Sequence, residues 1–203
     1  MRCAKRALDI IVASALLTLA LPVELLAALT IWLSMGSPVI FRQVRPGRDQ
    51  EPYTLLKFRT MRSASGGHET DGDRLTAIGK VLRRTSIDEL PQLVNVLRGE
   101  MSLVGPRPLL VRYLPYFTAE ERRRFDVQPG ITGWAQIHGR NRLDWNERLA
   151  LDVWYVNHWS FVLDLHILLE TAQAVIRRRD VVVDANIELQ DLDVLRREAG
   201  SGR

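Results

Sequence analysis

A continuous apolar segment at the start of the chain most constrains how the chain can fold. From Leu8 to Met35 the only charged residues are Asp9 and Glu24, whereas the rest of the 203 residues have the mixed composition of a soluble domain. A straight helix over this segment would extend roughly 40 Å, which exceeds the roughly 30 Å hydrocarbon layer of a bilayer. The sequence therefore predicts a membrane segment, residues 1–36, ahead of a soluble domain.

Two features predict that this segment enters and leaves the bilayer by the same face. Pro22 lies near its middle and interrupts the helical hydrogen-bond ladder. Basic residues flank both ends, and the positive-inside tendency would keep both flanks in the cytoplasm. These residues are Arg2, Lys5, Arg6, Arg42, Arg45 and Arg48. We therefore expect a re-entrant helix hairpin that is bent at Pro22.

Two alternatives to the hairpin stay open. One is a single-pass anchor that is only kinked at the proline. The other is a secretory signal, because basic residues precede the apolar stretch. The stretch is about twice as long as the apolar region of a normal signal, and no small-residue cleavage site follows it. The signal is therefore the less favoured of the two.

Charge and composition narrow the function classes. The net charge of +4 and the pI of about 9.6 suit anionic partners such as anionic lipid or phosphorylated small molecules. No recognised nucleic-acid-binding motif accompanies this charge, so we expect no nucleic-acid partner. Cys3 is the only cysteine and the four histidines lack metal-ligand spacing, which argues against a disulfide or a zinc site.

The remainder reads as a mainly helical α+β domain over residues 37–180, followed by a weakly specified tail, residues 181–203. SPVIFRQVR and EPYTLLKFRTM flank the turn-rich residues 46–49 and predict a β-hairpin, with Lys57 and Arg59 on one strand face. Periodicity and caps predict helices over 76–84, 88–98, 118–127, 143–159 and 161–178, whereas 63–73 and PGITGWAQIHGRN are expected to be loops.

Aromatic residues cluster in the later helices. Four of the five tryptophans fall there, and we expect either an interfacial belt on amphipathic helices beside the membrane segment or simple core packing. These residues are Trp134, Trp145, Trp154 and Trp159.

The stretch RRTSIDELPQL places an Asp-Glu pair just before an apolar run. Ser86 and Glu89 match a capping box, which would make the acidic residues purely structural. Pro91 argues against that register, because a helix that starts at Ile87 would need the missing proline N–H for an internal bond. A helix that starts with Asp88 as its cap removes the conflict and leaves backbone N–H groups available to an anion. We expect both carboxylates to be displayed toward a docking site, without neighbours that neutralise them.

Basic residues elsewhere in the domain give this acidic pair a chemical context. Arginine and lysine can offset phosphate oxygens, and the candidates are Lys57, Arg59, Arg83, Arg84, Arg107 and Arg140. Mg²⁺ needs only one or two carboxylates plus substrate phosphates, so Asp88 and Glu89 are candidate ligands. A carboxylate can also attack phosphorus and form a covalent intermediate, which makes Asp88 the candidate nucleophile. For each arginine taken alone, a solvated basic face is the alternative.

Several long motifs, in fixed order, carry a family resemblance. They are KRALD, SPVIFRQVRPG, KFRTM, LRRTSIDELPQLVNVLRGEMSLVGPRPL, PGITGWAQIHGRN and LDVWYVNHWSFVLDLHIL. Together they cover about Lys5 to Arg178, and the chain resembles the bacterial sugar transferases, the monotopic phosphoglycosyl transferases that begin glycan assembly on a polyprenyl phosphate. One departure is Leu21, because the family often has a serine before the hairpin proline.

The resemblance implies a reaction and a place for it. It implies a re-entrant helix in the bacterial inner membrane, an active site that faces the cytoplasm, and Mg²⁺. A sugar 1-phosphate would pass from a nucleoside diphosphate sugar, such as a UDP-sugar, to a polyprenyl phosphate such as undecaprenyl phosphate. By the same resemblance Asp88 attacks the phosphate that bears the sugar and releases UMP, and Glu89 assists with metal or proton handling. Arg107 and Arg59 would contact phosphates or the nucleotide.

Other functions remain as alternatives. A membrane-anchored scaffold that binds anionic lipid through its basic face would use the acidic pair only as a cap. A glycosidase is disfavoured, because its paired carboxylates lie about 5 to 9.5 Å apart on separate elements. The sequence leaves open which sugar and which glycan pathway (exopolysaccharide, O-antigen or glycoprotein) are served, and whether the chain forms a homodimer.

Overall fold

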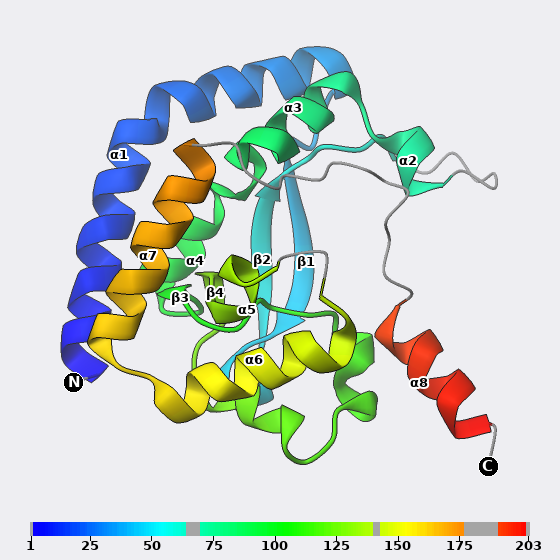
Figure 1. Ribbon diagram of the computed structural model, residues 1–203. Helices are drawn as coiled ribbons and strands as arrows, with labels where there is room; N and C mark the ends of the chain where they lie inside the picture. The colour runs from blue at the N-terminus through cyan, green and yellow to red at the C-terminus, as the bar shows by residue number, and fades with distance from the viewer. Residues whose placement is uncertain (1, 64–69, 140–142, 177–190, 202–203) are drawn as a thin grey trace.

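The computed structural model describes residues 2–63, 70–139, 143–176 and 191–201, and these are mainly helical (Figure 1). The α-helices are α1 (Arg2–Met35), α2 (Asp71–Arg74), α3 (Ala77–Thr85), α4 (Gln92–Arg98), α5 (Trp134–Ile137), α6 (Trp145–His158), α7 (Phe161–Ile176) and α8 (Leu192–Ser201). The 3-10 helices are η1 (Arg48–Gln50), η2 (Ile87–Glu89), η3 (Val111–Tyr116) and η4 (Glu121–Asp126). The strands are β1 (Ile40–Pro46), β2 (Pro52–Phe58), β3 (Ser102–Val104) and β4 (Gly130–Thr132). This architecture fits the expected α+β class.

The apolar segment forms one bent helix rather than two helices packed against each other. Helix α1 is 34 residues long with Pro22 inside it. Its first arm runs beside α7 and its second arm turns away toward α3 (Figure 1). Ala13 on the first arm is buried in the main core, whereas Ala27 and Ile31 on the second arm pack with Phe58 and other residues of a second cluster. The bend therefore lets both arms contact the domain.

Most of the surface of α1 faces outward. The most apolar 18-residue window of α1 has a mean hydropathy of 2.3, and only 11% of this window is buried. Leu19 and Leu33, for example, are 77% and 69% exposed. By length and composition α1 is able to cross a membrane, although the first helix of a secreted protein would pass the same test.

Polar contacts fix the start of α1 to the domain. The Lys5 ammonium donates to the Asp164 carboxylate at 2.6 Å and to the carbonyl of Val104 at 3.0 Å. The buried Asp9 carboxylate accepts hydrogen bonds from the Ser102 hydroxyl and from the Leu103 backbone N–H. The start of α1 and the β3 region therefore form one packed unit.

The predicted β-hairpin is confirmed, but β2 ends at Phe58, so Arg59 lies beyond the strand rather than on one strand face with Lys57. Strands β1 and β2 pair antiparallel in a register that runs from Ile40 opposite Phe58 to Pro46 opposite Pro52. Helix α4 packs on β2 through Asn95, whose amide donates to the carbonyl of Thr54 at 2.7 Å and whose oxygen accepts from a β2 backbone N–H. Because Asn95 is fully buried, this amide satisfies backbone groups of the strand that would otherwise lack partners.

The prediction of a loop over PGITGWAQIHGRN was wrong for residues 130–137. Strand β4 pairs in parallel with β3, and helix α5 follows at once. Gly105 and Gly130 make the pairing close, because a Cβ on Gly130 would lie 2.1 Å from the Gly105 nitrogen. Such a short strand pair depends on a contact between distant parts of the chain, so local periodicity does not reveal it.

The later helices match the expectation closely. Asp144 caps α6 in a reciprocal capping box with Glu147, and the Ser160 hydroxyl accepts from the Leu163 backbone N–H at the start of α7. The predicted reciprocal hydrogen bonds between Thr118 and Glu121 also form, but the helix that follows is the 3-10 helix η4 rather than an α-helix, and its N-cap is Glu120. Of the expected loop over 63–73, residues 64–69 lie outside the described residues, and the prediction was wrong for residues 71–73, which belong to α2.

The tryptophans are divided among different environments. Trp134 and Trp154 stack with ring centroids 4.6 Å apart, whereas Trp145 belongs to a separate core cluster. Trp159 donates to the Asp164 carboxylate at 3.0 Å. Core packing therefore accounts for Trp145, and Trp154, which is 37% exposed, keeps a surface position.

Candidate active site

The acidic pair lies in the 3-10 turn η2 between α3 and α4. Ser86, which ends α3, adopts a left-handed conformation with φ of 57° and makes no side-chain cap bond. Helix α4 begins at Gln92 with Pro91 before it. The capping box and the expected cap at Asp88 were therefore both wrong. The chain forms a 3-10 turn first, and the proline without an N–H then occupies the start of the α-helix, where no internal donor is needed. The predicted anion site at a helix start near Asp88 is lost with the cap.

Glu89 is held by two cations. Its Oε1 accepts from the Lys57 ammonium and from the Arg107 guanidinium, each at 2.7 Å. Burial favours the neutral acid, but the charges of Arg107 and Lys57 and their hydrogen bonds outweigh it and hold the pKa of Glu89 well below its ordinary value. Glu89 is therefore a carboxylate whose charge is already balanced, contrary to the expectation that both acidic residues would be displayed without partners.

Asp88 is in a different electrostatic state. Its side chain has no hydrogen-bond partner among the described residues, and the residue is 7% exposed. Burial and then the charge of Glu89 raise the pKa of Asp88 to about 6, although Lys57, Arg107 and Arg83 oppose the rise. Two neighbouring carboxylates thus have pKa values shifted in opposite directions. Such a division often accompanies different chemical roles.

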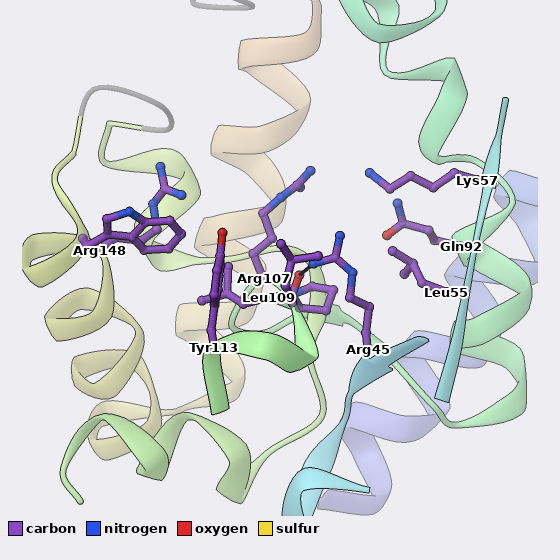
Figure 2. A pocket seen from close by; sticks show the side chains of 11 residues that line it. Arg45, Leu55, Lys57, Gln92, Arg107, Leu109, Tyr113 and Arg148 are labelled. Carbon is purple, nitrogen blue, oxygen red and sulfur yellow. Dashed lines mark hydrogen bonds between the residues drawn. The ribbon is translucent and has the colours of Figure 1, made fainter. Parts of the chain in front are cut away.

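A cavity of about 200 Å³ lies beside this pair. Figure 2 shows the side chains of Lys57, Arg107 and Arg45 directing their cationic ends toward the same space, with Arg148 across from them. The lining residues are Arg45, Leu55, Lys57, Gln92, Arg107, Pro108, Leu109, Leu110, Tyr113, Trp145 and Arg148. Asp88 and Glu89 do not line the cavity themselves, so the expectation that both carboxylates would face a docking site was wrong for this cavity. Lys57 and Arg107 connect the cavity to the acidic pair, because both side chains line the cavity and both donate to Glu89.

The cavity concentrates positive charge in a partly buried place. Burial, followed by the nearby charge of Arg107, lowers the pKa of Arg45 to about 10. The Arg45 Nε is buried and has no hydrogen-bond partner among the described residues. Burial also lowers the pKa of Lys57, although Glu89 opposes this. Cations from β1, β2 and the β3–η3 connection therefore converge where an anionic ligand would relieve their mutual repulsion.

The other predicted site residues have varied positions. Arg83 donates to the Thr60 hydroxyl at 3.2 Å and is near enough to influence Asp88. Arg84 is exposed at the end of α3. Arg140 lies outside the described residues. Of the predicted cations, the structure thus places Lys57 and Arg107 against the acidic pair, with Arg83 nearby.

Arg59 is engaged in structural contacts. Its guanidinium donates to the backbone carbonyls of Met61, Pro38 and Met35, the last at the C-terminus of α1. Arg59→Ala is therefore expected to destabilise the fold by about 1–3 kcal/mol, because three backbone carbonyls, one of them at the end of α1, lose a charged donor. Thermal unfolding of the detergent-solubilised variant would measure this. An unchanged unfolding midpoint together with weaker donor binding would instead indicate the phosphate role expected from sequence.

Five polar or aromatic lining residues were not predicted as site residues: Arg45, Gln92, Tyr113, Trp145 and Arg148. Arg45 lies in the family motif SPVIFRQVRPG, so this motif could have indicated that Arg45 belongs to the site. Gln92 and Tyr113 are buried within helical segments, and nothing local in the sequence separates them from ordinary core residues.

The residues present fit a magnesium ion that has few protein ligands. Among the described residues no group of three or more His, Cys, Asp or Glu side chains could hold a metal. Asp88 and the Oε2 atom of Glu89 have no hydrogen-bond partner in that part of the chain, so they offer carboxylate oxygens. Mg²⁺ is commonly held by one or two carboxylates and completed by substrate phosphates and water.

Comparison with known proteins gives the class. A profile of the family described as "Bacterial sugar transferase" matches residues 1–178, so the chain belongs to this family. The chain is accordingly a transferase enzyme, which decides against a scaffold without catalysis.

Its relatives include proteins with named reactions. The chain is 49% identical over 201 residues to "Uncharacterized sugar transferase EpsL" of Bacillus subtilis (strain 168), covering 98% of this chain and 96% of the relative. It is 42% identical to a UDP-glucose:undecaprenyl-phosphate glucose-1-phosphate transferase of Caulobacter vibrioides, covering 85% of this chain and 69% of the relative. A protein of the same name from Escherichia coli (strain K12) is 43% identical, and 39% of its length is covered.

Proposed function

We propose that this protein transfers a sugar 1-phosphate from a UDP-sugar to undecaprenyl phosphate or another polyprenyl phosphate, with Asp88 as the nucleophile. Relatives that are 42% and 43% identical are named for this reaction with UDP-glucose. One observation carries the assignment to this site. Asp88 has no partner among the described residues, while the adjacent Glu89 is bound by two cations that line a cavity.

The proposed reaction has two displacements at one phosphorus atom. An Asp88 carboxylate oxygen attacks the phosphorus that bears the sugar, and the bond from that phosphorus to the bridging oxygen breaks. UMP leaves with the electron pair. An oxygen of the lipid phosphate then attacks the same phosphorus, the bond to Asp88 breaks, and the carboxylate is regenerated. The lipid product carries a diphosphate-linked sugar, the first membrane-bound intermediate of a glycan.

Access to Asp88 is part of this proposal. Because Asp88 is 7% exposed and does not line the cavity, whereas Lys57 and Arg107 do, the donor would reach it only when side chains of the cavity move. Both cations can exchange the Glu89 carboxylate for phosphate oxygens, since arginine and lysine bind either anion. The exchange would bring the diphosphate toward Asp88 and release Glu89 to hold Mg²⁺. When bound, Mg²⁺ would neutralise charge on the phosphate oxygens.

Release of UMP tests the proposed function. Detergent-solubilised protein, incubated with Mg²⁺, a UDP-sugar and undecaprenyl phosphate, should release UMP and form a lipid-linked phosphosugar. EDTA should stop the reaction, and added Mg²⁺ should restore it. A panel of UDP-sugars would also identify the sugar. Absence of UMP release with every UDP-sugar in the panel would refute the proposal.

The pH dependence of the first step follows from Asp88. The nucleophile must be ionised, and its pKa is raised to about 6. We therefore expect kcat/KM for the UDP-sugar to fall below about pH 6, roughly tenfold per pH unit. An acid limb near pH 4, the range of an ordinary aspartate, would contradict the buried position of the nucleophile.

The membrane topology is proposed as well. We infer that α1 is re-entrant in the bacterial inner membrane and that the active site faces the cytoplasm, because Pro22 and the bend leave both ends of α1 on the domain (Figure 1). Single cysteines placed near each end of α1, in a Cys3→Ser background, should both be labelled from the cytoplasmic side. Labelling of the N-terminal site from the periplasm would instead favour a single-pass anchor.

A further inference from the structure

The C-terminal helix lies outside the family region but packs on the cavity wall. The family profile ends at residue 178, whereas α8 spans Leu192–Ser201. Leu192 is fully buried in a cluster that includes Tyr113, Trp145 and Leu149. Tyr113 and Trp145 line the cavity, so the start of α8 supports the other side of an aromatic wall that the donor would meet.

Asp191, just before α8, is bound directly to this wall. Its carboxylate accepts hydrogen bonds from the Tyr113 hydroxyl and from the Arg112 guanidinium. Further along the helix, Arg196 donates to Glu121 at 2.7 Å and fixes α8 to η4. The carboxylate of Asp191 is thus fixed at one end of a docked helix, and it accepts a hydrogen bond from the hydroxyl of Tyr113, which lines the cavity.

Tyr113 needs support from Asp191 because the helix that carries this tyrosine has weak internal hydrogen bonding. Tyr113 lies in η3, a 3-10 helix that contains Pro115. Helices of this type have poorer hydrogen-bond geometry than α-helices, and proline removes one donor. Tyr113 also contacts Trp145 edge to face, with ring centroids 5.5 Å apart. A shift of the tyrosine would therefore move both aromatic rings of the wall.

We infer that Asp191 is a positioning residue for donor binding, which holds the aromatic wall of the UDP-sugar cavity in place through the Tyr113 hydroxyl. This inference rests on the proposed function. It adds a C-terminal segment, beyond the family-wide region, to the determinants of donor affinity. Asp191 does not touch the reacting atoms, so it affects how tightly the donor is bound rather than the displacement at phosphorus.

Kinetics of UMP release by the full chain test the inference. Asp191→Ala and Tyr113→Phe should each raise the KM for the UDP-sugar about five- to tenfold, within the range for loss of an ordinary intramolecular hydrogen bond, and change kcat less than about twofold. The double variant should show no greater rise than either single variant, because both remove the same hydrogen bond. Arg197→Ala removes a different contact of α8, to Tyr116, and should leave the KM unchanged.

Each result has one meaning. No UMP release by the unsubstituted protein would refute the proposed function, whereas an active protein whose KM is unaffected by Asp191→Ala would refute only the inference. An additive rise in the double variant, or an equal rise in Arg197→Ala, would show that α8 acts as general structural support and would also overturn it. Tyr113→Phe loses only a hydroxyl, so it keeps the test valid should Asp191→Ala fail to fold.

Discussion

Asp88→Asn is expected to lower the rate of UMP release at least about 1,000-fold, because an amide oxygen cannot replace a carboxylate as the nucleophile. The substitution conserves the size of the side chain and removes only its charge. Initial rates with Mg²⁺, UDP-sugar and undecaprenyl phosphate measure the loss. Activity within about tenfold of the unsubstituted enzyme would exclude the covalent role of Asp88.

The stability of the same variant provides its control. Because the pKa of Asp88 is raised from 3.8 to about 6 on folding, the folded state holds the proton more tightly than the unfolded chain. The ionised side chain therefore destabilises the fold as the pH rises through this window, at a cost on the order of 3 kcal/mol above pH 6. Asp88→Asn removes that cost and should be more stable than the unsubstituted protein at pH 8, with little difference at pH 4. A lower unfolding midpoint at pH 8 would mean that lost activity reflects misfolding.

Arg107→Ala is expected to lower kcat/KM about 100-fold, the second largest effect in the site. The arginine lines the cavity and donates to Glu89 at 2.7 Å, so its loss removes a cation from the donor site and leaves Glu89 with Lys57 alone. Initial rates over a range of UDP-sugar concentrations would separate the effects on KM and kcat.

Two further variants show whether charge or geometry matters. Arg107→Lys keeps the charge but loses the planar pair of donors, and it should recover only part of the activity. Arg98→Ala removes an exposed arginine at the end of α4, and its kcat/KM should be close to that of the unsubstituted enzyme. Equal activity of Arg107→Ala and Arg98→Ala would show that Arg107 contributes no more than a surface charge.

Local sequence signals predicted the elements that depend on local contacts. The side chain of Thr76 accepts from the Gly79 N–H at the start of α3, and Gly99 ends α4 with a positive φ of 81°, as expected from their cap preferences. The hairpin of β1 and β2 was likewise predicted from a turn between two β-prone runs. In each case the residues that determine the structure are neighbours in the chain.

Features that depend on distant contacts were missed. The pairing of β3 with β4 requires Gly105 and Gly130 to approach closely across a gap in sequence, and no local pattern records this. At the site, the acidic pair and its two cations were predicted, but the fixed pairing of Glu89 was not. The hydrogen bonds from Arg59 to backbone carbonyls were also not predicted. The same arginine in a sequence motif can bind phosphate or donate to the carbonyls at the end of a helix, and the sequence does not distinguish these roles.

The most direct test of the central claim is the mass of the enzyme after incubation with Mg²⁺ and UDP-sugar in the absence of lipid acceptor. Rapid quenching and peptide mapping should find one phosphosugar group attached to Asp88, and later addition of undecaprenyl phosphate should remove it. Asp88→Asn should carry no adduct. Turnover with lipid present but no adduct at Asp88 under these conditions would indicate direct transfer between donor and acceptor, and would contradict a two-step reaction at this residue.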